Sequence, residues 1–297
     1  MSSLRHPHPA ADSIEHVSLP HPFAAGDGVD PDEDKPQEAC GVFGIYSPED
    51  AVAKLTYFGL FALQHRGQEA AGIATFDGKI LHLHKNSGLV NQVFDEEILG
   101  TLPGRLAIGH TRYSTTGSSH QANAQPVMVE TNRGPFALAH NGNLVNAYEL
   151  RQELKTGVDP QTTTDSEMIA LAIAEAVDQG QGWIAATTAA LKRCQGAFSL
   201  TMATSTGVMG ARDPNGIRPL VLGQLPDTKR YVLASETCAL DIIGARFIRN
   251  VEPGELVWID DAGVTSVQWS EPSRKLCVFE MIYFSRPDSV VDGETLY

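Results

Sequence analysis

The most constraining feature of this chain is an abrupt change in composition at Cys40. Residues 1–39 contain eight acidic side chains, two basic side chains and six prolines, which is typical of a disordered leader. The apolar run 41–46 follows at once and predicts a buried strand. If the leader is removed, Cys40 carries both a thiol and a free α-amine, and an α-amine with its ordinary pKa of about 8 can act as a base. The alternative is a buried cysteine that packs as a small hydrophobic residue.

The overall composition predicts a folded protein that does not bind nucleic acid. Hydrophobic residues make up 42% of the 297 residues and charged residues 20%, which is enough for one large domain or two ordinary ones. The net charge of −14 argues against a nucleic-acid-binding surface, because phosphate contacts need clustered Lys and Arg. No apolar run has the length of a membrane span, and the N-terminus has no apolar core of a signal peptide.

The cysteines do not form a disulfide framework. The four cysteines are far apart and include no Cys-X-X-Cys pair; they are Cys40, Cys194, Cys238 and Cys277. Such spacing favours a reducing compartment, so we expect a cytoplasmic protein.

Hydrophobic patterning predicts an α+β fold. Strands are expected at residues 41–46, 71–76, 79–84, 106–110 and 136–140, helices at 49–64, 144–155, 168–177 and 183–193, and further strands at 197–204, 207–211, 220–223, 231–234 and 255–259. Strands, then helices, then strands again indicate helices packed on sheets.

Polar motifs follow two of the short strands. Arg112 stands among hydroxyl side chains, and a guanidinium there suits a carboxylate because it donates two parallel hydrogen bonds. The alternative is a surface arginine in a salt bridge. Asn141 and Gly142 predict either a hairpin turn or an oxyanion hole, in which the Asn141 amide and the Gly142 N–H bind a developing negative charge.

Asp165 lies at the start of a predicted helix. The run 164–167 is a capping-box pattern, so the ordinary role of Asp165 is to stabilise the helix N-terminus. The functional alternative is that its carboxylate holds an ammonium group.

These motifs occur in an order that resembles the class II glutamine amidotransferases. The resemblance is carried by residues 40–45, 64–68, 109–115, 139–143 and 164–167. Tyr113 and the segments 212–219 and 279–289 narrow it to the family of glutamine phosphoribosylpyrophosphate amidotransferases, which open de novo purine synthesis. The resemblance covers residues 40–297 and implies a four-layer αββα N-terminal-nucleophile hydrolase sandwich of two antiparallel sheets flanked by helices.

The resemblance also implies roles for individual residues. Cys40 is the nucleophile that attacks the glutamine side-chain amide, with its own α-amine as the base. Asn141 and Gly142 form the oxyanion hole, Arg112 binds the glutamine α-carboxylate, and Asp165 binds its α-amine. Further contacts or loop closure over glutamine are implied for Thr115, Tyr113, Arg66 and Gly67.

Two departures from the family pattern affect cofactors. A cysteine preceded by a long leader is typical of the subgroup with a cleaved propeptide, which also carries a [4Fe–4S] cluster. Cys277 matches the first cluster ligand of that subgroup, but Cys194 and Cys238 match no others, so the remaining ligands are expected outside this chain. The phosphoribosyltransferase domain, with its phosphoribosylpyrophosphate (PRPP) and Mg²⁺, is expected after residue 297.

One run imitates a phosphoribosylpyrophosphate loop. Residues 256–265 combine an apolar strand, two acidic residues, small residues and a threonine. The same pattern predicts a hairpin turn between two strands, which we favour.

The sequence therefore predicts three segments: a leader at 1–39, a class II glutamine amidotransferase domain at 40–275, and the start of a linker to the phosphoribosyltransferase domain at 276–297. The expected activity is hydrolysis of glutamine to glutamate and ammonia through a Cys40 thioester, as one half of the family's reaction. We expect glutamine as substrate, PRPP only in the full-length enzyme, neither nucleic acid nor membrane as a partner, and a homo-oligomer. The alternatives are another class II glutamine amidotransferase and an unprocessed glutamine-binding domain.

Overall fold

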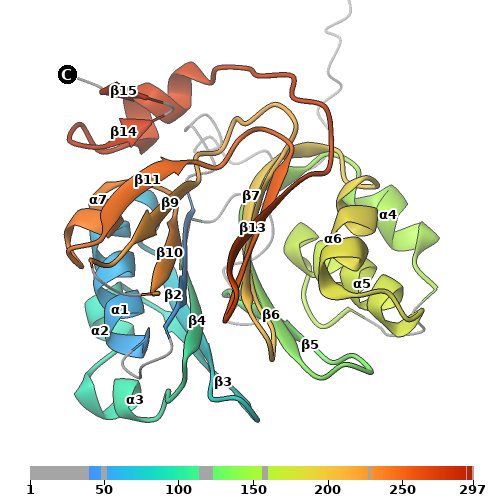
Figure 1. Ribbon diagram of the computed structural model, residues 1–297, viewed down its shortest axis with the longest axis horizontal. Coiled ribbons are helices and arrows are strands. Elements are labelled where there is room, and N and C mark those ends of the chain that lie inside the picture. Colours follow the sequence, from blue (N-terminus) through green and yellow to red (C-terminus); the bar gives the residue numbers. More distant parts are fainter. Residues whose placement is uncertain are drawn as a thin grey trace, which may run out of the picture. The chain divides into compact units, whose positions relative to one another are not determined.

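Two antiparallel sheets pack face to face in the computed structural model, which describes residues 40–47, 52–113, 123–155, 160–226, 229–291 and 293–295. Helices cover the outer face of each sheet (Figure 1). This arrangement confirms the predicted four-layer αββα sandwich. The expected leader and Thr115 lie outside the described residues.

The first sheet has seven strands in the order β11-β9-β10-β1-β4-β2-β3. In chain order these are β1 Gly41–Tyr46, β2 Ala70–Phe76, β3 Leu81–Ser87, β4 Leu106–Arg112, β9 Val221–Gln224, β10 Tyr231–Ala234 and β11 Arg246–Asn250. The strand expected after the leader, β1, lies in the middle, between β10 and β4. Cys40 therefore enters the fold at the centre of one end of this sheet.

The second sheet has six strands in the order β13-β12-β8-β7-β6-β5. They are β5 Val127–Val129, β6 Phe136–Leu144, β7 Gly196–Ala203, β8 Val208–Arg212, β12 Glu255–Asp260 and β13 Gly263–Gln268. The register pairs Asp260 with Gly263, so the acidic run at 260–261 is a hairpin turn, as predicted, and not a phosphate loop.

The helices divide between the two outer faces. The first sheet is covered by α1 Val52–Ala62, α2 Val90–Val93, α3 Glu96–Gly100 and α7 Cys238–Asp241, and the second by α4 Ala147–Glu153, α5 Asp165–Asp178 and α6 Trp183–Leu191. A 3₁₀ turn, η1 Gln64–Arg66, follows α1. Among the described residues no helix is long and apolar enough to cross a membrane.

Alternation of side chains along the strands builds three separate cores. On β1, Val42 packs between the sheets while Phe43 packs against the helices of the first sheet. On β6, Ala139 packs between the sheets while Leu138 packs against the helices of the second sheet. On β1 the even-numbered side chains therefore face the other sheet, and on β6 the odd-numbered side chains do.

Two sequence interpretations need correction. The Asn141-Gly142 pair is not a hairpin turn, because β6 continues to Leu144 and pairs with β7 throughout. The capping-box pattern locates the start of α5 correctly, but the Thr164 side chain makes no capping hydrogen bond. The carboxylate of Glu167 instead accepts hydrogen bonds from the backbone N–H groups of Gln161 and Thr162.

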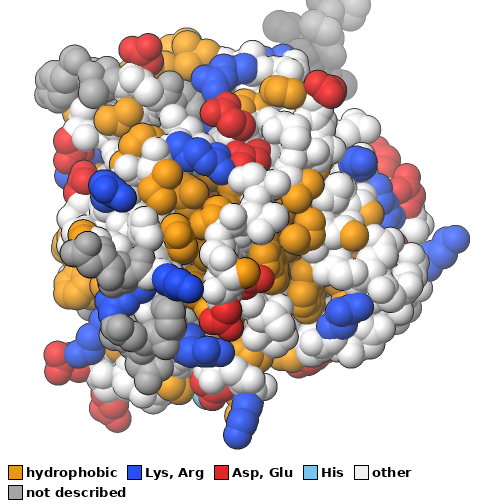
Figure 2. All heavy atoms as spheres, in the orientation of Figure 1, with side chains coloured by type: hydrophobic (Ala, Val, Ile, Leu, Met, Phe, Trp, Pro, Cys, Tyr) orange, Lys and Arg blue, Asp and Glu red, His pale blue; other side chains and the backbone are white. Residues whose placement is uncertain are grey.

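The chain after β13 crosses the end of the first sheet (Figure 1). It contains a short π-helical turn at Glu280–Phe284 and a small hairpin of β14 Val290–Val291 and β15 Glu294–Thr295. On the face drawn in Figure 2, Lys and Arg side chains are interspersed with Asp and Glu around a band of hydrophobic side chains. The described residues on that face thus present mixed charge and not a single basic patch.

Candidate active site

Cys40 lies beside the end of β4. The register pairs Gly41 with Thr111, so antiparallel pairing brings the residue before β1 next to Arg112 and Tyr113. The Cys40 Sγ donates to the carbonyl oxygen of Tyr113 at 3.8 Å. Sequence-distant residues of the predicted site are thereby brought together by one strand pair.

Strand alternation turns three of the predicted site residues toward the space between the sheets. Arg112 shares its strand face with Ile108, which belongs to the inter-sheet core, and Asn141 shares its face with Ala139. Cys40 precedes Val42 by two positions and continues the inward face of β1. The nucleophile, the cation and the amide therefore converge at one end of the sandwich.

The thiol of Cys40 is strongly protonated in this environment. Burial raises its pKa to about 11, although the positive charges of Arg112 and Arg218 act in the opposite direction. The negative charge of Asp165, at the start of α5, acts in the same direction as burial. A base is thus required before Cys40 can attack at neutral pH.

Arg112 is a nearly buried cation for which the described residues supply no partner. Arg112 is only 6% exposed, yet its guanidinium makes no hydrogen bond or ion pair within the described part of the chain. Its backbone is fixed from behind by Gly67, where an added Cβ would lie 2.6 Å from the Arg112 carbonyl carbon. A buried unpaired guanidinium is costly, so Arg112 is suited to receive a carboxylate from a ligand.

Asn141 is a buried amide for which the described part of the chain supplies no partner. The residue is fully buried, and neither Nδ2 nor Oδ1 has a hydrogen-bond partner among the described residues. Leaving a buried polar group unsatisfied costs about 1–3 kcal/mol. The uncommitted Nδ2 donor is what an oxyanion hole requires.

The backbone N–H of Gly142 points away from β7. Gly142 pairs with Phe198 in the register, and the N–H and C=O of Phe198 both bond to Asp213, at 3.0 Å each. In an antiparallel ladder such a pair is of the non-hydrogen-bonded kind. The Gly142 N–H is therefore directed to the opposite edge of β6.

The amides on either side of Gly142 show what this edge binds. The N–H of His140 donates to the Gln125 Oε1 at 2.7 Å, and the N–H of Leu144 donates to the Asp165 Oδ2 at 2.8 Å. Both acceptors are oxygens, and the Gly142 N–H points the same way between them. Beside the Asn141 amide, it is placed as a second donor for an oxyanion.

Asp165 is held as an anion at the start of α5. Burial tends to raise its pKa, but His140 and the N–H of Leu144 outweigh burial and leave the pKa below its ordinary value. The His140 Nδ1 lies 3.1 Å from the Ser166 Oγ and 3.5 Å from the Asp165 Oδ1. A charged carboxylate in this position can hold an ammonium group.

The remaining predicted residues are placed differently. Tyr113 is half-buried and meets Cys40 through its backbone. The guanidinium of Arg66 is fully buried and bound to Glu236 and Glu280, so its contact with substrate stays a prediction and this placement gives it no support. Gly67 acts through its close packing on the Arg112 backbone.

Cys277 does not lie in a cluster site formed by the described residues. It is a half-buried free thiol, and the described part of the chain contains no group of three His, Cys, Asp or Glu side chains arranged to hold a metal ion. An iron–sulfur cluster needs about four thiolates. The described residues alone therefore do not fit such a cluster.

Sequence reasoning missed several supporting residues. His140, Ser166 and Gln125 orient the Asp165 side of the site, and Arg218 adds positive charge near Cys40. His140 stood in a motif that had already been singled out. Arg218 lay in the segment 212–219, but nothing in that segment indicated that its charge would act on Cys40 in the folded chain.

The sequence and the fold both match glutamine amidotransferases. Residues 110–241 match the model of the glutamine amidotransferase domain. The chain is 65% identical to the amidophosphoribosyltransferase of Synechocystis over 268 residues, which are 89% of this chain and 54% of that protein. It is 46% identical to the amidophosphoribosyltransferase of Bacillus subtilis over 264 residues, covering 86% of this chain and 53% of that protein.

A solved structure of an amidotransferase has a similar fold. The glutamine phosphoribosylpyrophosphate amidotransferase from B. subtilis, in complex with ADP and GMP, superimposes with a TM-score of 0.79 at 44% identity, covering 86% of this chain and 55% of that chain. The chain thus spans about half the length of the curated relatives it matches.

Proposed function

We propose that this chain hydrolyses glutamine to glutamate and ammonia. It carries a glutamine amidotransferase domain and is closely related to amidophosphoribosyltransferases over about half of their length. The observation that carries the proposal is that Arg112 and Asn141 lie at the end of the sandwich where Cys40 enters β1, and neither side chain has a polar partner among the described residues.

The proposed reaction starts at the thiol. Sγ of Cys40 attacks the side-chain amide carbon of glutamine, and the α-amine released by removal of the leader takes the thiol proton. The negative oxygen of the tetrahedral intermediate is bound by the Asn141 Nδ2 and the Gly142 N–H. The amine then gives the proton to the leaving nitrogen, ammonia departs, and water cleaves the thioester to release glutamate.

The two ionic groups of the site match the two charges of an amino acid. The guanidinium of Arg112 suits the α-carboxylate, because it donates in pairs to a carboxylate. The carboxylate of Asp165 suits the α-ammonium group, because its pKa is held below the ordinary range and it stays charged. Together they select a zwitterion and leave its side chain at Cys40.

For the complete protein we propose the activity of the relatives. Ammonia from glutamine would be joined to PRPP to give phosphoribosylamine, with Mg²⁺ bound alongside PRPP in a domain outside this chain. A cytoplasmic location, removal of residues 1–39, a homo-oligomer and a [4Fe–4S] cluster with Cys277 as one ligand are parts of the same proposal. The chemistry of the cluster contributes no step at Cys40.

A glutamine-binding domain without turnover is the competing function. With its pKa at about 11, the thiol of Cys40 is inert at neutral pH unless a base is near, so a chain that keeps its leader would bind glutamine and not hydrolyse it. A different class II amidotransferase would share the glutaminase chemistry and differ only in the acceptor of ammonia.

The test measures glutamate and ammonia released from glutamine by the purified chain, together with glutamine binding by calorimetry. The proposal expects both turnover and binding, and Cys40→Ser is expected to keep binding and lose turnover. Binding without turnover in a chain that begins at Cys40 would contradict the proposal and support the competing function.

A further inference from the structure

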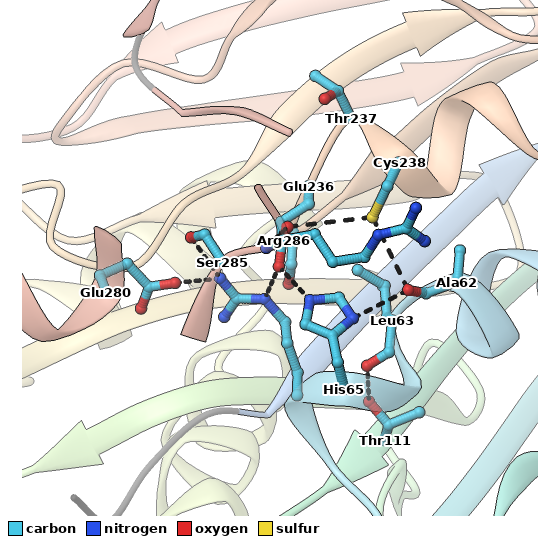
Figure 3. Close-up of polar contacts among 12 residues, drawn as sticks. Ala62, Leu63, His65, Thr111, Glu236, Thr237, Cys238, Glu280, Ser285 and Arg286 are labelled. Atoms are coloured by element: carbon cyan, nitrogen blue, oxygen red, sulfur yellow. Dashed lines mark hydrogen bonds and ion pairs between the residues drawn. The ribbon is translucent and has the colours of Figure 1, made fainter. Parts of the chain in front are cut away.

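A buried ion cluster lies next to the site and has no role in the proposed chemistry. It consists of Arg66, Arg218, Glu236 and Glu280, and none of the four side chains is more than 7% exposed. Arg66 donates to both Glu236 and Glu280, and the Arg218 Nη1 donates to the Glu280 Oε2 at 2.9 Å. Two positive and two negative charges balance, and Figure 3 shows Glu236 and Glu280 converging with His65 and Ser285.

The cluster attaches the C-terminal segment to the domain. Besides Glu280, the Ser285 hydroxyl accepts a hydrogen bond from Arg66 at 3.4 Å, and the backbone N–H of Arg286 donates to Glu236 at 2.8 Å. The backbone N–H of Val290 donates to Thr237 at 3.0 Å. The segment is thus held largely by polar contacts that join it to η1 and to the turn before α7.

Apolar burial contributes less to this attachment. Several large hydrophobic side chains of the segment are exposed: Leu276 by 71%, Phe279 by 54%, Ile282 by 67% and Tyr283 by 65%. Buried ion pairs are weak evidence for stability, because desolvation of the charges offsets much of their attraction. The cluster is therefore a candidate for a positioning role.

Each arginine of the cluster is connected to the site, Arg66 through the backbone that follows it and Arg218 through its charge. Gly67, the residue after Arg66, packs directly on the backbone of Arg112. Arg218 acts on the Cys40 thiol and favours its ionised form. Glu280 binds both arginines with its two carboxylate oxygens, so one side chain from the C-terminal segment fixes two supports of the site.

We propose that Glu280 is a positioning residue for the reaction at Cys40. It holds Arg218 near the thiol, and it holds Arg66 and thereby Gly67, which packs on the backbone of Arg112. The inference rests on the proposed function. It makes the π-helical turn at Glu280–Phe284 part of the glutaminase site, although the turn lies outside the matched amidotransferase model at residues 110–241. Any displacement of this turn would then be transmitted to Cys40.

The test is the pH dependence of Cys40 alkylation by iodoacetamide, followed by peptide mass spectrometry in the full chain that begins at Cys40. Glu280→Gln removes the charge that fixes Arg218. The pH at which alkylation of Cys40 is half-maximal is expected to rise by about one unit. Glu280→Gln is also expected to lower kcat/KM for glutamine about tenfold. Glu271→Gln, at an exposed position in the same part of the chain, is expected to change neither.

A double variant keeps the test valid if Glu280→Gln folds poorly. Arg218→Gln with Glu280→Gln removes one charge of each sign and leaves the pair of Arg66 and Glu236 intact. Because part of the effect of Glu280 runs through Arg218, the shift of the alkylation midpoint in the double variant is expected to be smaller than the sum of the two single shifts. Glu280→Asp keeps the charge and is expected to recover most of the activity.

The inference is overturned if the midpoint of Glu280→Gln equals that of the unchanged chain, or if the shifts of the two single variants add in the double variant. An unchanged midpoint in Arg218→Gln would overturn it as well. Alkylation does not require turnover, so the two failures are distinguishable. If the unchanged chain hydrolyses no glutamine, the proposed function fails; if it is active and Glu280→Gln matches it, only the positioning role fails.

Discussion

At the scale of single residues, the site is defined by buried polar groups that have no partners among the described residues. Arg112 and Asn141 are buried, and both lie at the end of the sandwich where Cys40 enters β1. By contrast, the carboxylate of Asp165 already has neighbours that orient it: the Leu144 N–H, the Ser166 hydroxyl and the His140 ring. Unpaired donors beside a protonated thiol prepare the site for a negative oxygen and a carboxylate.

Asn141→Ala tests the oxyanion hole. Loss of one donor is expected to lower kcat for glutamine hydrolysis by about 10²- to 10³-fold with little change in KM, because the donor is needed mainly in the transition state. Steady-state kinetics measure both parameters. Asn86→Ala, on the exposed edge of the first sheet, serves as the matched control. An unchanged kcat in the Asn141 variant would remove Asn141 from the mechanism.

Arg112→Lys tests recognition of the α-carboxylate. A lysine keeps the charge but cannot donate two parallel hydrogen bonds, so KM for glutamine is expected to rise about 10-fold or more. Arg105→Lys, at an exposed position before β4, is expected to leave KM unchanged. A normal KM in the Arg112 variant would show that the carboxylate binds elsewhere.

At the scale of secondary structure elements, close packing of β6 on β7 determines where the oxyanion donors lie. Gly142 has a φ of 144°, and an added Cβ would lie 2.0 Å from the Ala197 carbonyl oxygen. The donor pair at 141–142 therefore depends on a glycine that allows the strands to approach.

Gly142→Ala is expected to destabilise the protein by about 1–3 kcal/mol and to abolish most glutaminase activity, because β6 must move away from β7. Gly134→Ala is the matched control: Gly134 also has a positive φ, of 96°, but no atom lies within 4 Å of its added Cβ. Thermal unfolding and turnover are measured for both variants. Equal effects would show that backbone strain, and not the contact with β7, is responsible.

Sequence patterns predicted the elements where local signals and tertiary context agree. The strands at 41–46 and 71–76 and the hairpin turn within 256–265 formed as expected. The Asn141-Gly142 pair carried a turn signal that sheet pairing overrode, since β6 had a partner along its whole length. The ion cluster of Arg66, Glu236 and Glu280 was invisible because its members are brought together only by the fold.

At the scale of the whole molecule, one histidine between the sheets, His110, makes stability depend on pH. Burial lowers the pKa of His110 from 6.5 to about 3, and its Nε2 lies 3.0 Å from the His140 carbonyl oxygen. Below pH 6.5 the unfolded chain binds a proton that the folded chain does not. The free energy of unfolding therefore falls as the pH drops from 6.5 toward 3.

His110→Gln is expected to flatten this dependence, because an amide can still donate to the His140 carbonyl but does not titrate. His110 contributes up to about 1.4 kcal/mol per pH unit in the affected window. Urea unfolding from about pH 7 to about pH 4 measures the slope, with His84→Gln on the edge strand β3 as control. An unchanged slope in the His110 variant would assign the acid sensitivity to other groups.

We propose that Cys40 becomes the N-terminal nucleophile of a glutaminase. The most direct measurement is the intact mass and N-terminal residue of the purified protein, before and after reaction with an electrophilic glutamine analogue. We expect a chain that begins at Cys40 and gains one adduct at the thiol of Cys40. A chain that begins at Cys40 but gains no adduct there, or an adduct at another cysteine, would contradict the proposal.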